Sequence, residues 1–119
     1  ESVRGPNCTD SLVAAGIVRV VVGLTDPDPR TRMLAAIAVG KLGSKEQVAD
    51  LVAVLETNGD KDEYVRHGAI QGMVRIGDAD AIFAFAQSKS AAVRRAVTKA
   101  AADWVVWRDG ELARRAKTP

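Results

Sequence analysis

The stretch DPDPRTRMLAAIAVGKLG, residues 26–43, recurs in altered form at residues 60–77 and again at residues 88–104. Each copy begins with a polar turn and continues with apolar residues every three or four positions, which is the period of an amphipathic helix. Self-similarity at such a spacing is typical of repeat proteins, in which each unit buries its apolar face against its neighbours. We therefore expect stacked helical repeats, which present an extended binding surface rather than an enclosed catalytic pocket.

Helix signals divide the chain into six predicted helices and place it in the all-α class, because no run of alternating β-branched residues interrupts them. We expect helices at about 11–24, from after Asp28 to Gly43, from after Ser44, from after Asp62 to Gly77, at about 79–87, and from after Ser90 to Trp107. Thr9 or Asp10 would cap the first helix, Asp78 would cap the fifth, and Asp109-Gly110 would end the sixth. Three antiparallel pairs are the simplest arrangement.

Aligned on their caps, the second helices of the pairs share further positions. The caps Asp28, Asp62 and Ser90 are 34 and 28 residues apart, and an arginine follows each cap by four residues. Positions that are apolar in all three copies are Ala35, Ala69 and Val97; Val39, Met73 and Ala101; and Leu42, Ile76 and Trp104. These positions are expected to form the buried face.

The pattern from Thr31 to Gly43 resembles the second helix of a HEAT repeat, and is similar to the short HEAT-like variant of phycobilisome lyases. The resemblance covers about residues 12–107. In the third copy, Ser88 stands where the first two copies have Asp26 and Asp60, and Val105 stands in place of the terminal glycine. It implies a right-handed α-solenoid of about three antiparallel helix pairs. The expected organisation is an extension at 1–10, a repeat domain at 11–107 (repeats at about 11–43, 45–77 and 79–107), and a tail or the start of another element at 108–119.

The resemblance also implies a structural role for the repeated arginines. In HEAT repeats an aspartate and an arginine six residues apart form a ladder between neighbouring repeats. The positions that match are Asp26 with Arg32 and Asp60 with Arg66, and Arg94 is the arginine of the third copy. If this ladder is buried, removal of Arg66 should cost several kcal/mol, because Asp60 would lose its partner.

A second set of positions is the candidate binding surface. Residues spaced by four along each of these helices form one ridge per repeat, and similarity to HEAT arrays places the ridges side by side on the concave surface. We call them the ridge residues: Met33, Ile37, Lys41, His67, Gln71, Arg75, Arg95, Lys99 and Asp103. Met33 and Ile37 would either anchor a partner or be covered by a preceding repeat; the second reading is favoured.

Charge is unevenly distributed, since residues 1–87 carry a net charge of −3 and residues 88–119 a net charge of +5. Trp104, Trp107 and Arg108 lie in this basic part, and aromatic rings interleaved with arginines can stack on bases. Nucleic-acid or other polyanion binding through the basic third is therefore the alternative to docking of a protein or of another domain of the same chain. Trp104 aligns with core positions, so we expect it to pack, and we expect Trp107 to be exposed.

Other sites have weaker support. One histidine, His67, lacks the ligand cluster that a metal needs, and Cys8 has no partner for a disulfide or for catalysis. Gly40 to Ser44 lacks the spacing of a phosphate-binding loop. No segment is long and apolar enough to cross a membrane, so no membrane insertion is expected. The prediction is a non-catalytic module without catalytic residues, metal or cofactor.

Two further resemblances extend the alternatives. Association of the variant repeat with phycobilisome lyases suggests a tetrapyrrole-lyase-like role, by analogy of fold. Residues 60–69 are similar to HEAT segments of large extracytoplasmic bacterial proteins that carry a dehydrogenase-like β-propeller and a c-type haem domain. That resemblance implies a spacer or docking region in such a protein, without a haem-attachment motif of its own. Since the chain begins at Glu1 without a methionine, we expect it to be part of a longer protein.

Overall fold

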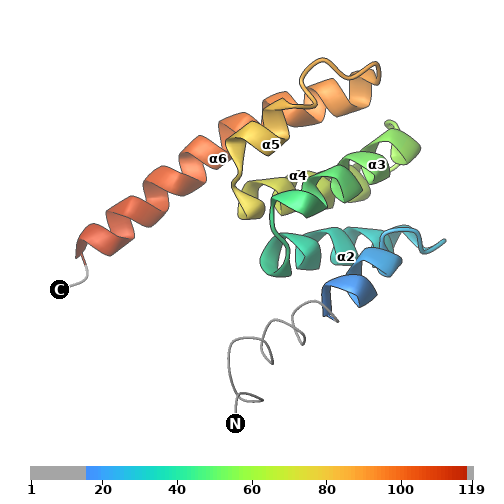
Figure 1. Cartoon of the computed structure of the whole chain (residues 1–119), viewed down its shortest axis with the longest axis horizontal. Helices are drawn as coiled ribbons and strands as arrows, with labels where there is room; N and C mark the ends of the chain where they lie inside the picture. Colours follow the sequence, from blue (N-terminus) through green and yellow to red (C-terminus); the bar gives the residue numbers. More distant parts are fainter. Residues whose placement is uncertain (1–15, 118–119) are drawn as a thin grey trace, which may run out of the picture.

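The computed structural model describes residues 16–117, and all regular secondary structure within them is helical (Figure 1). A helical segment at 16–23 is followed by α2 (Pro29–Leu42), the short 3-10 helix η2 (Lys45–Gln47), α3 (Val48–Asn58), α4 (Glu63–Ile76), α5 (Ala79–Phe83) and α6 (Ala91–Lys117). The all-α prediction is confirmed. The expected extension at 1–10, with Cys8 and the caps Thr9 and Asp10, lies outside the described residues.

The starts of α2, α4, α5 and α6 agree with the predicted caps. Asp28 accepts a hydrogen bond from the backbone N–H of Arg30 at 3.2 Å, with Pro29 at the first helical position. Asp62 accepts two, from Tyr64 and Val65, at 2.8 and 3.1 Å. Helix α4 ends as expected at Gly77, which adopts the left-handed conformation with φ 69° that favours glycine. The remaining caps are Asp78, which accepts from the N–H of Ala81 at 2.9 Å, and Ser90, which accepts from the N–H of Val93 at 3.3 Å.

Three predicted helices differ in their bounds from the structure. The helix after Ser44 opens with η2, in which the Ser44 N–H donates to the Gln47 side chain at 2.7 Å. The Ser44 hydroxyl donates to Glu46, and this bond holds the pKa of the Glu46 carboxyl below its ordinary value. Helix α5 stops at Phe83 instead of Gln87, because the N–H groups of Phe85 and Ala86 bond to carbonyls three residues back and tighten the chain into a turn.

Helix α6 is the largest departure, because it continues through Asp109-Gly110 to Lys117 instead of ending at Trp107. One glycine in a helix costs about 1 kcal/mol relative to alanine, and the following residues, ELARRAK, are mostly good helix formers. Basic residues in the last turn, including Arg115 and Lys117, also suit the negative end of the helix dipole. The local stop signal is therefore overridden by its surroundings.

Helix α4 lies at the centre of the fold, in contact with α2 on one side and α6 on the other (Figure 1). Helix α3 packs against both α4 and α6, and α5 packs against α6. The core is aliphatic, and its largest fully buried side chains are Leu51, Leu55, Met73, Val39, Val48, Val65 and Val93. Of the expected core positions, Leu42 is exposed, because it lies on the side of α2 that faces away from α4.

Helices α2 and α4 approach each other through small residues. A Cβ added to Gly72 would lie 2.6 Å from the carbonyl oxygen of Ala36, and one added to Gly68 would lie 2.8 Å from that of Met33. The two backbones are therefore in direct contact, with no side chain between them at these points. Because residue numbers rise together along the contact, the two helices run in the same direction.

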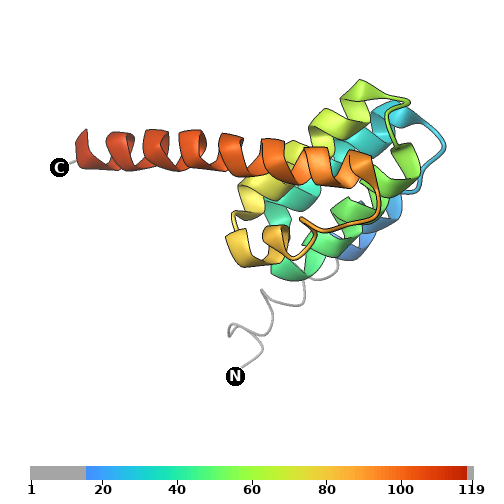
Figure 2. The same ribbon diagram turned by 90° about the horizontal axis from the view of Figure 1, so that it is seen from above.

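The outer half of α6 leaves the body of the protein. Figure 2 shows α6 extending well beyond the other described helices. Trp104 packs against the core near Gly77, where its Nε1 is 3.1 Å from the place a glycine Cβ would take. From Val105 to Lys117 the residues are exposed except for the half-buried Glu111. The expected packing of Trp104 and exposure of Trp107 are confirmed. None of the helices within residues 16–117 has the length and apolar content needed to cross a membrane.

Candidate functional site

The ridge residues lie on α2, α4 and α6, three helices in which α4 contacts both others. Their exposure changes along the array. On α2, Met33 and Ile37 are half-buried, whereas Lys41 is exposed. The remaining members are exposed, except for the half-buried Asp103: His67, Gln71 and Arg75 on α4, and Arg95, Lys99 and Asp103 on α6.

Met33 is partly covered by a helix of this chain. Its Cγ lies 3.0 Å from where a Cβ on Gly68 would be, so the side chain packs on α4. The small size of Gly68 leaves room for the thioether beside the α4 backbone. The contact with α4 is made within the chain, and because part of Met33 is still accessible, the favoured expectation that a preceding repeat covers it stays a prediction.

Two basic members of the ridge are already neutralised within the chain. Arg95 on α6 forms an ion pair and a hydrogen bond with Asp60, in the loop before α4. Lys99 pairs with Asp103 one helical turn later, at 3.1 Å. Charge on the α6 part of the ridge is therefore much lower than a count of its lysines and arginines suggests.

Lys41 and Arg75 differ from these, because neither has an ion pair or side-chain hydrogen bond with any residue in 16–117. Both lie in the last turn of their helix, α2 and α4, where a cation is favoured by the helix dipole. The two helix ends are close at this point, since the Cβ of Arg75 is 3.1 Å from where a Cβ on Gly40, the residue before Lys41, would be. The ends of two neighbouring helices thus carry two cations that have no carboxylate partner within residues 16–117.

Of the expected aspartate–arginine pairs, Asp60 with Arg66 is present. Arg32 and Arg94, the arginines of the first and third copies, have different partners. Arg66 Nη1 lies 3.6 Å from Asp60 Oδ1, and the same carboxylate binds Arg95, so Asp60 links α4 to α6. Arg32 donates to the backbone carbonyls of Asp26 and Pro27, at 2.7 and 3.0 Å, instead of to the Asp26 carboxylate.

In the third copy the ladder shifts by one residue. Arg94, the expected member, donates to the backbone carbonyl of Ser88 at 2.6 Å, which repeats the Arg32 bond at the same spacing of six. Its neighbour Arg95, expected on the ridge, takes the place in the ladder. In the third copy, Ser88 stands where the second copy has Asp60. Arg94 therefore bonds to the backbone carbonyl of Ser88 instead of to a carboxylate.

A hollow of about 380 Å³ opens between α4 and α6 where α6 leaves the body. Three ridge residues line it, Gln71, Arg75 and Asp103, together with Val74, Val106 and Trp107. Val106 is 73% exposed and Trp107 is 38% exposed, so apolar surface lies next to the unpaired guanidinium of Arg75. Sequence reasoning missed Val74 and Val106, because it followed one line of positions spaced by four and these residues lie just beside it.

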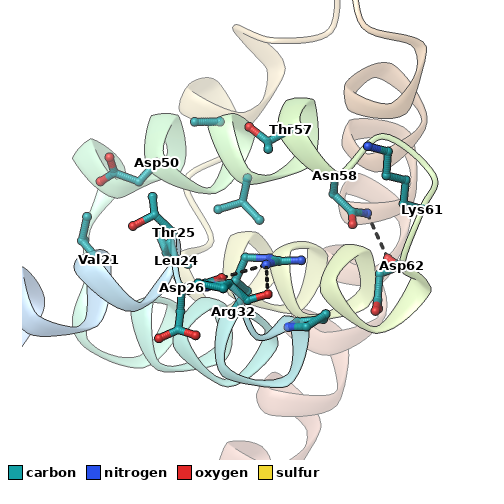
Figure 3. Close-up of a pocket in the computed structure, with 14 residues that line it drawn as sticks. Val21, Leu24, Thr25, Asp26, Arg32, Asp50, Thr57, Asn58, Lys61 and Asp62 are labelled. Atoms are coloured by element: carbon teal, nitrogen blue, oxygen red, sulfur yellow. Dashed lines mark hydrogen bonds between the residues drawn. The ribbon is translucent and has the colours of Figure 1, made fainter.

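A larger hollow, of about 590 Å³, lies on another part of the fold, between α3 and the segment 24–32 (Figure 3). Arg32, Asn58 and Asp62 are among its lining residues, and each is engaged with the chain. Besides the two carbonyl bonds of Arg32, the Asn58 amide donates to the backbone carbonyl of Asp62 at 2.9 Å. These groups hold the loops that form the walls, and the carboxylates of Asp26, Asp50 and Asp62 mix with the charges of Arg32 and Lys61.

Large apolar side chains are exposed on the first helical segment and on α2. They are Val18 and Val22 of the segment and Leu34 and Leu42 of α2. Leu34 precedes Gly68 by 34 residues, which is the spacing of the repeat. It therefore occupies on α2 the position that Gly68 occupies on α4, where α4 contacts α2. At that equivalent position Leu34 is 56% exposed.

Four of the eight lysines and arginines of the basic third, Arg95, Lys99, Arg108 and Arg114, form ion pairs. The Arg108 guanidinium lies 4.8 Å from the centre of the Trp104 ring and 3.3 Å from Asp109, and Arg114 pairs with Glu111. No cluster of three or more potential metal-ligating side chains occurs within residues 16–117. Neither a family model, nor a curated protein, nor a solved structure matches the chain.

Proposed function

We propose that the chain is a non-catalytic helical-repeat scaffold, whose ridge residues dock a protein segment or another domain of the same chain. In this proposal residues 11–107 form a right-handed solenoid of three antiparallel helix pairs, as the HEAT resemblance implies. The parallel contact of α2 with α4 supports it. So does the parallel course of α4 and α6, whose starts are joined by Asp60 and Arg95 and whose Gly77 and Trp104 lie together.

Contacts within each proposed pair support the same arrangement. Gly16 lies near Leu42 and Gly23 near Ala35, so the first helical segment runs opposite to α2. Leu51, in the first half of α3, contacts Gly72 in the last half of α4, and a short loop joins the other ends of these two helices. Stacked pairs of this kind expose one long surface formed by their second helices.

One observation carries the docking proposal: Lys41 and Arg75, at neighbouring helix ends on the exposed ridge, have no acidic partner among the described residues. Other cations on or near the ridge, Arg95 and Lys99, are held by carboxylates. An unpaired pair of cations beside exposed apolar residues suits a partner that brings both carboxylates and apolar side chains.

Polyanion binding through the basic third remains the second candidate, and the exposed Trp107 beside Arg108 favours it. The ion pairs of that segment weigh against it, since Arg95, Lys99, Arg108 and Arg114 each have an acidic partner. Nucleic-acid affinity rests mainly on phosphate contacts by lysine and arginine, which these carboxylates would oppose.

The test is capture from an extract of cells that make the protein, with the chain immobilised. Three forms would be compared: the unchanged chain, Lys41→Gln/Arg75→Gln, and the control Lys89→Gln/Arg115→Gln. Lys89 and Arg115 are exposed, carry the same two charges and have no ion pair among the described residues. Each eluate would be analysed for protein and, before and after nuclease treatment, for nucleic acid.

We expect a protein that is recovered by the unchanged chain and the control, and lost with the ridge variant. Equal recovery by all three forms would contradict docking through the ridge. Recovery that is abolished by nuclease, and weakened more by Lys89→Gln/Arg115→Gln than by the ridge variant, would replace the scaffold proposal with polyanion binding, because Lys89 and Arg115 belong to the basic third.

A further inference from the structure

The hollow between α4 and α6 offers a more specific inference than the ridge as a whole. It rests on the proposed function, because the occupant is a docking partner. Its lining combines two chemically different groups, which we call the apolar half (Val74, Val106 and Trp107) and the polar half (Gln71, Arg75 and Asp103), and α4 and α6 each contribute to both. A ligand that fills it must therefore satisfy an apolar wall and a cation at once.

The apolar half fits one side chain of a partner. Val74 on α4 is buried, whereas Val106 and Trp107, which follow Trp104 on α6, are exposed. A volume of about 380 Å³ is at the lower end for a small-molecule pocket and is open along the helices, which suits a side chain attached to an extended segment. A tryptophan at the rim is a typical anchor in protein docking.

The polar half selects an acidic group. Asp103 also lines the hollow, but its carboxylate is taken by Lys99 at 3.1 Å. Arg75 is left with no acidic partner among the described residues, and its Cβ lies next to Gly40, the residue before Lys41 at the end of α2. A carboxylate placed close to the apolar anchor would therefore meet the Arg75 guanidinium, which can bind it through two N–H groups, and the flexible Lys41 side chain starts nearby.

We propose that this hollow binds an acidic peptide segment of a partner protein, in which a leucine or an aromatic residue fills the apolar half and a nearby carboxylate pairs with Arg75 and Lys41. Single-stranded nucleic acid is the competing occupant. The hollow favours the peptide, because Val74 and Val106 give it aliphatic surface and because the carboxylate of Asp103, also in its lining, would repel phosphates.

The experiment uses short synthetic peptides in a glycine–serine background, in which one leucine or phenylalanine stands at varied spacing from a pair of glutamates. Matched peptides carry glutamine for glutamate, or alanine for the apolar residue. Binding is followed in the whole chain labelled with 5-fluorotryptophan, so that Trp104 and Trp107 each give a fluorine resonance. A Trp107→Phe variant assigns the two signals.

We expect at least one spacing to bind and to shift the Trp107 resonance, with binding weakened about tenfold or more when either the acidic or the apolar residue is replaced. Arg75→Gln should weaken the same peptide by a similar factor, whereas Lys89→Gln should leave it unchanged. Arg75 and Lys89 are both exposed, so neither change should disturb the fold, which circular dichroism would verify.

Three results would overturn the proposal. One is that the neutral peptides bind as well as the acidic ones; another is that no spacing shifts Trp107. The third is that a thymidine oligonucleotide moves this resonance at lower concentration than any peptide. If the peptides fail while capture from the extract still depends on Lys41 and Arg75, the ridge scaffold stands and the role of the hollow is rejected. Failure of both experiments would reject the scaffold as well.

Discussion

Gly40 and Gly72 face each other across the α2–α4 contact so closely that a Cβ added to Gly40 would lie 2.7 Å from the Cα of Gly72. No side chain fits between the two backbones at this point. The contact fixes the distance between α2 and α4, and therefore the spacing of the ridge residues that these helices carry.

Gly72→Ala should destabilise the fold. The new methyl group would lie 2.6 Å from the Ala36 carbonyl oxygen and 2.9 Å from Leu51 Cδ1, so α2 has to move away from α4. Overpacking of this kind costs about 1–3 kcal/mol, which urea or thermal unfolding would measure. Gly110→Ala is the matched control, because nothing lies within 4 Å of its added methyl group. It should stabilise α6 by about 0.5–1 kcal/mol, and the same sign for both changes would contradict the close contact.

Arg66→Ala should cost little, about 0–1 kcal/mol, instead of the several kcal/mol expected for a buried ladder. The reason is exposure, since the side chains of Arg66 and Asp60 are 38% and 54% accessible and lie 3.6 Å apart. A double-mutant cycle with Asp60→Ala, measured by chemical unfolding at low and high salt, would give the coupling energy. A coupling that stays above about 2 kcal/mol in high salt would show that solvent does not screen this pair.

Asp62→Ala should destabilise α4 by about 1 kcal/mol, because the N–H groups of Tyr64 and Val65 lose the carboxylate that accepts them. Asp62→Ser should restore most of the loss, since a serine hydroxyl can accept the same bonds. Thermal unfolding would compare the three proteins. Equal melting temperatures for alanine and serine would mean that the side-chain oxygen contributes nothing at this cap.

Leu51→Ala should be among the most damaging truncations, at about 2–5 kcal/mol, because its side chain is fully buried against Gly72. Leu34→Ala removes the same atoms from a side chain that is mostly in water, and should change stability by less than about 1 kcal/mol. The difference between the two, read from unfolding curves, tests whether the side of α2 that carries Leu34 lies outside the core. A loss at Leu34 as large as that at Leu51 would show that another surface covers it.

Much of the fold could be predicted because its signals are local. Helices α2 and α4 begin after an aspartate cap and end at a glycine, and both ends were found to the residue. The end of α6 could not be read in this way. Asp109-Gly110 is a valid stop signal, but helix formers on both sides make continuation cheaper than ending.

Partners across the fold were harder to predict, because they depend on helix rotation. Arg94 and Arg95 are adjacent in sequence but about 100° apart around α6, and only the packing of α6 on α4 decides which one reaches Asp60. The pairing of Lys99 with Asp103 was not predicted from the sequence either. It leaves Arg75 and Lys41 as the ridge arginine and lysine without an acidic partner among the described residues.

The outer half of α6 is a projecting helix that is held to the core only at its inner end. From Trp104, where the helix is held against the core, to Lys117 is about 20 Å at the rise of an α-helix. A pull at Lys117 directed away from α4 would turn α6 about Trp104 and open the hollow beside Arg75, because Val106 and Trp107, which line it, follow that point on α6. Mechanical load at the end of the chain and occupancy of the hollow would then oppose each other.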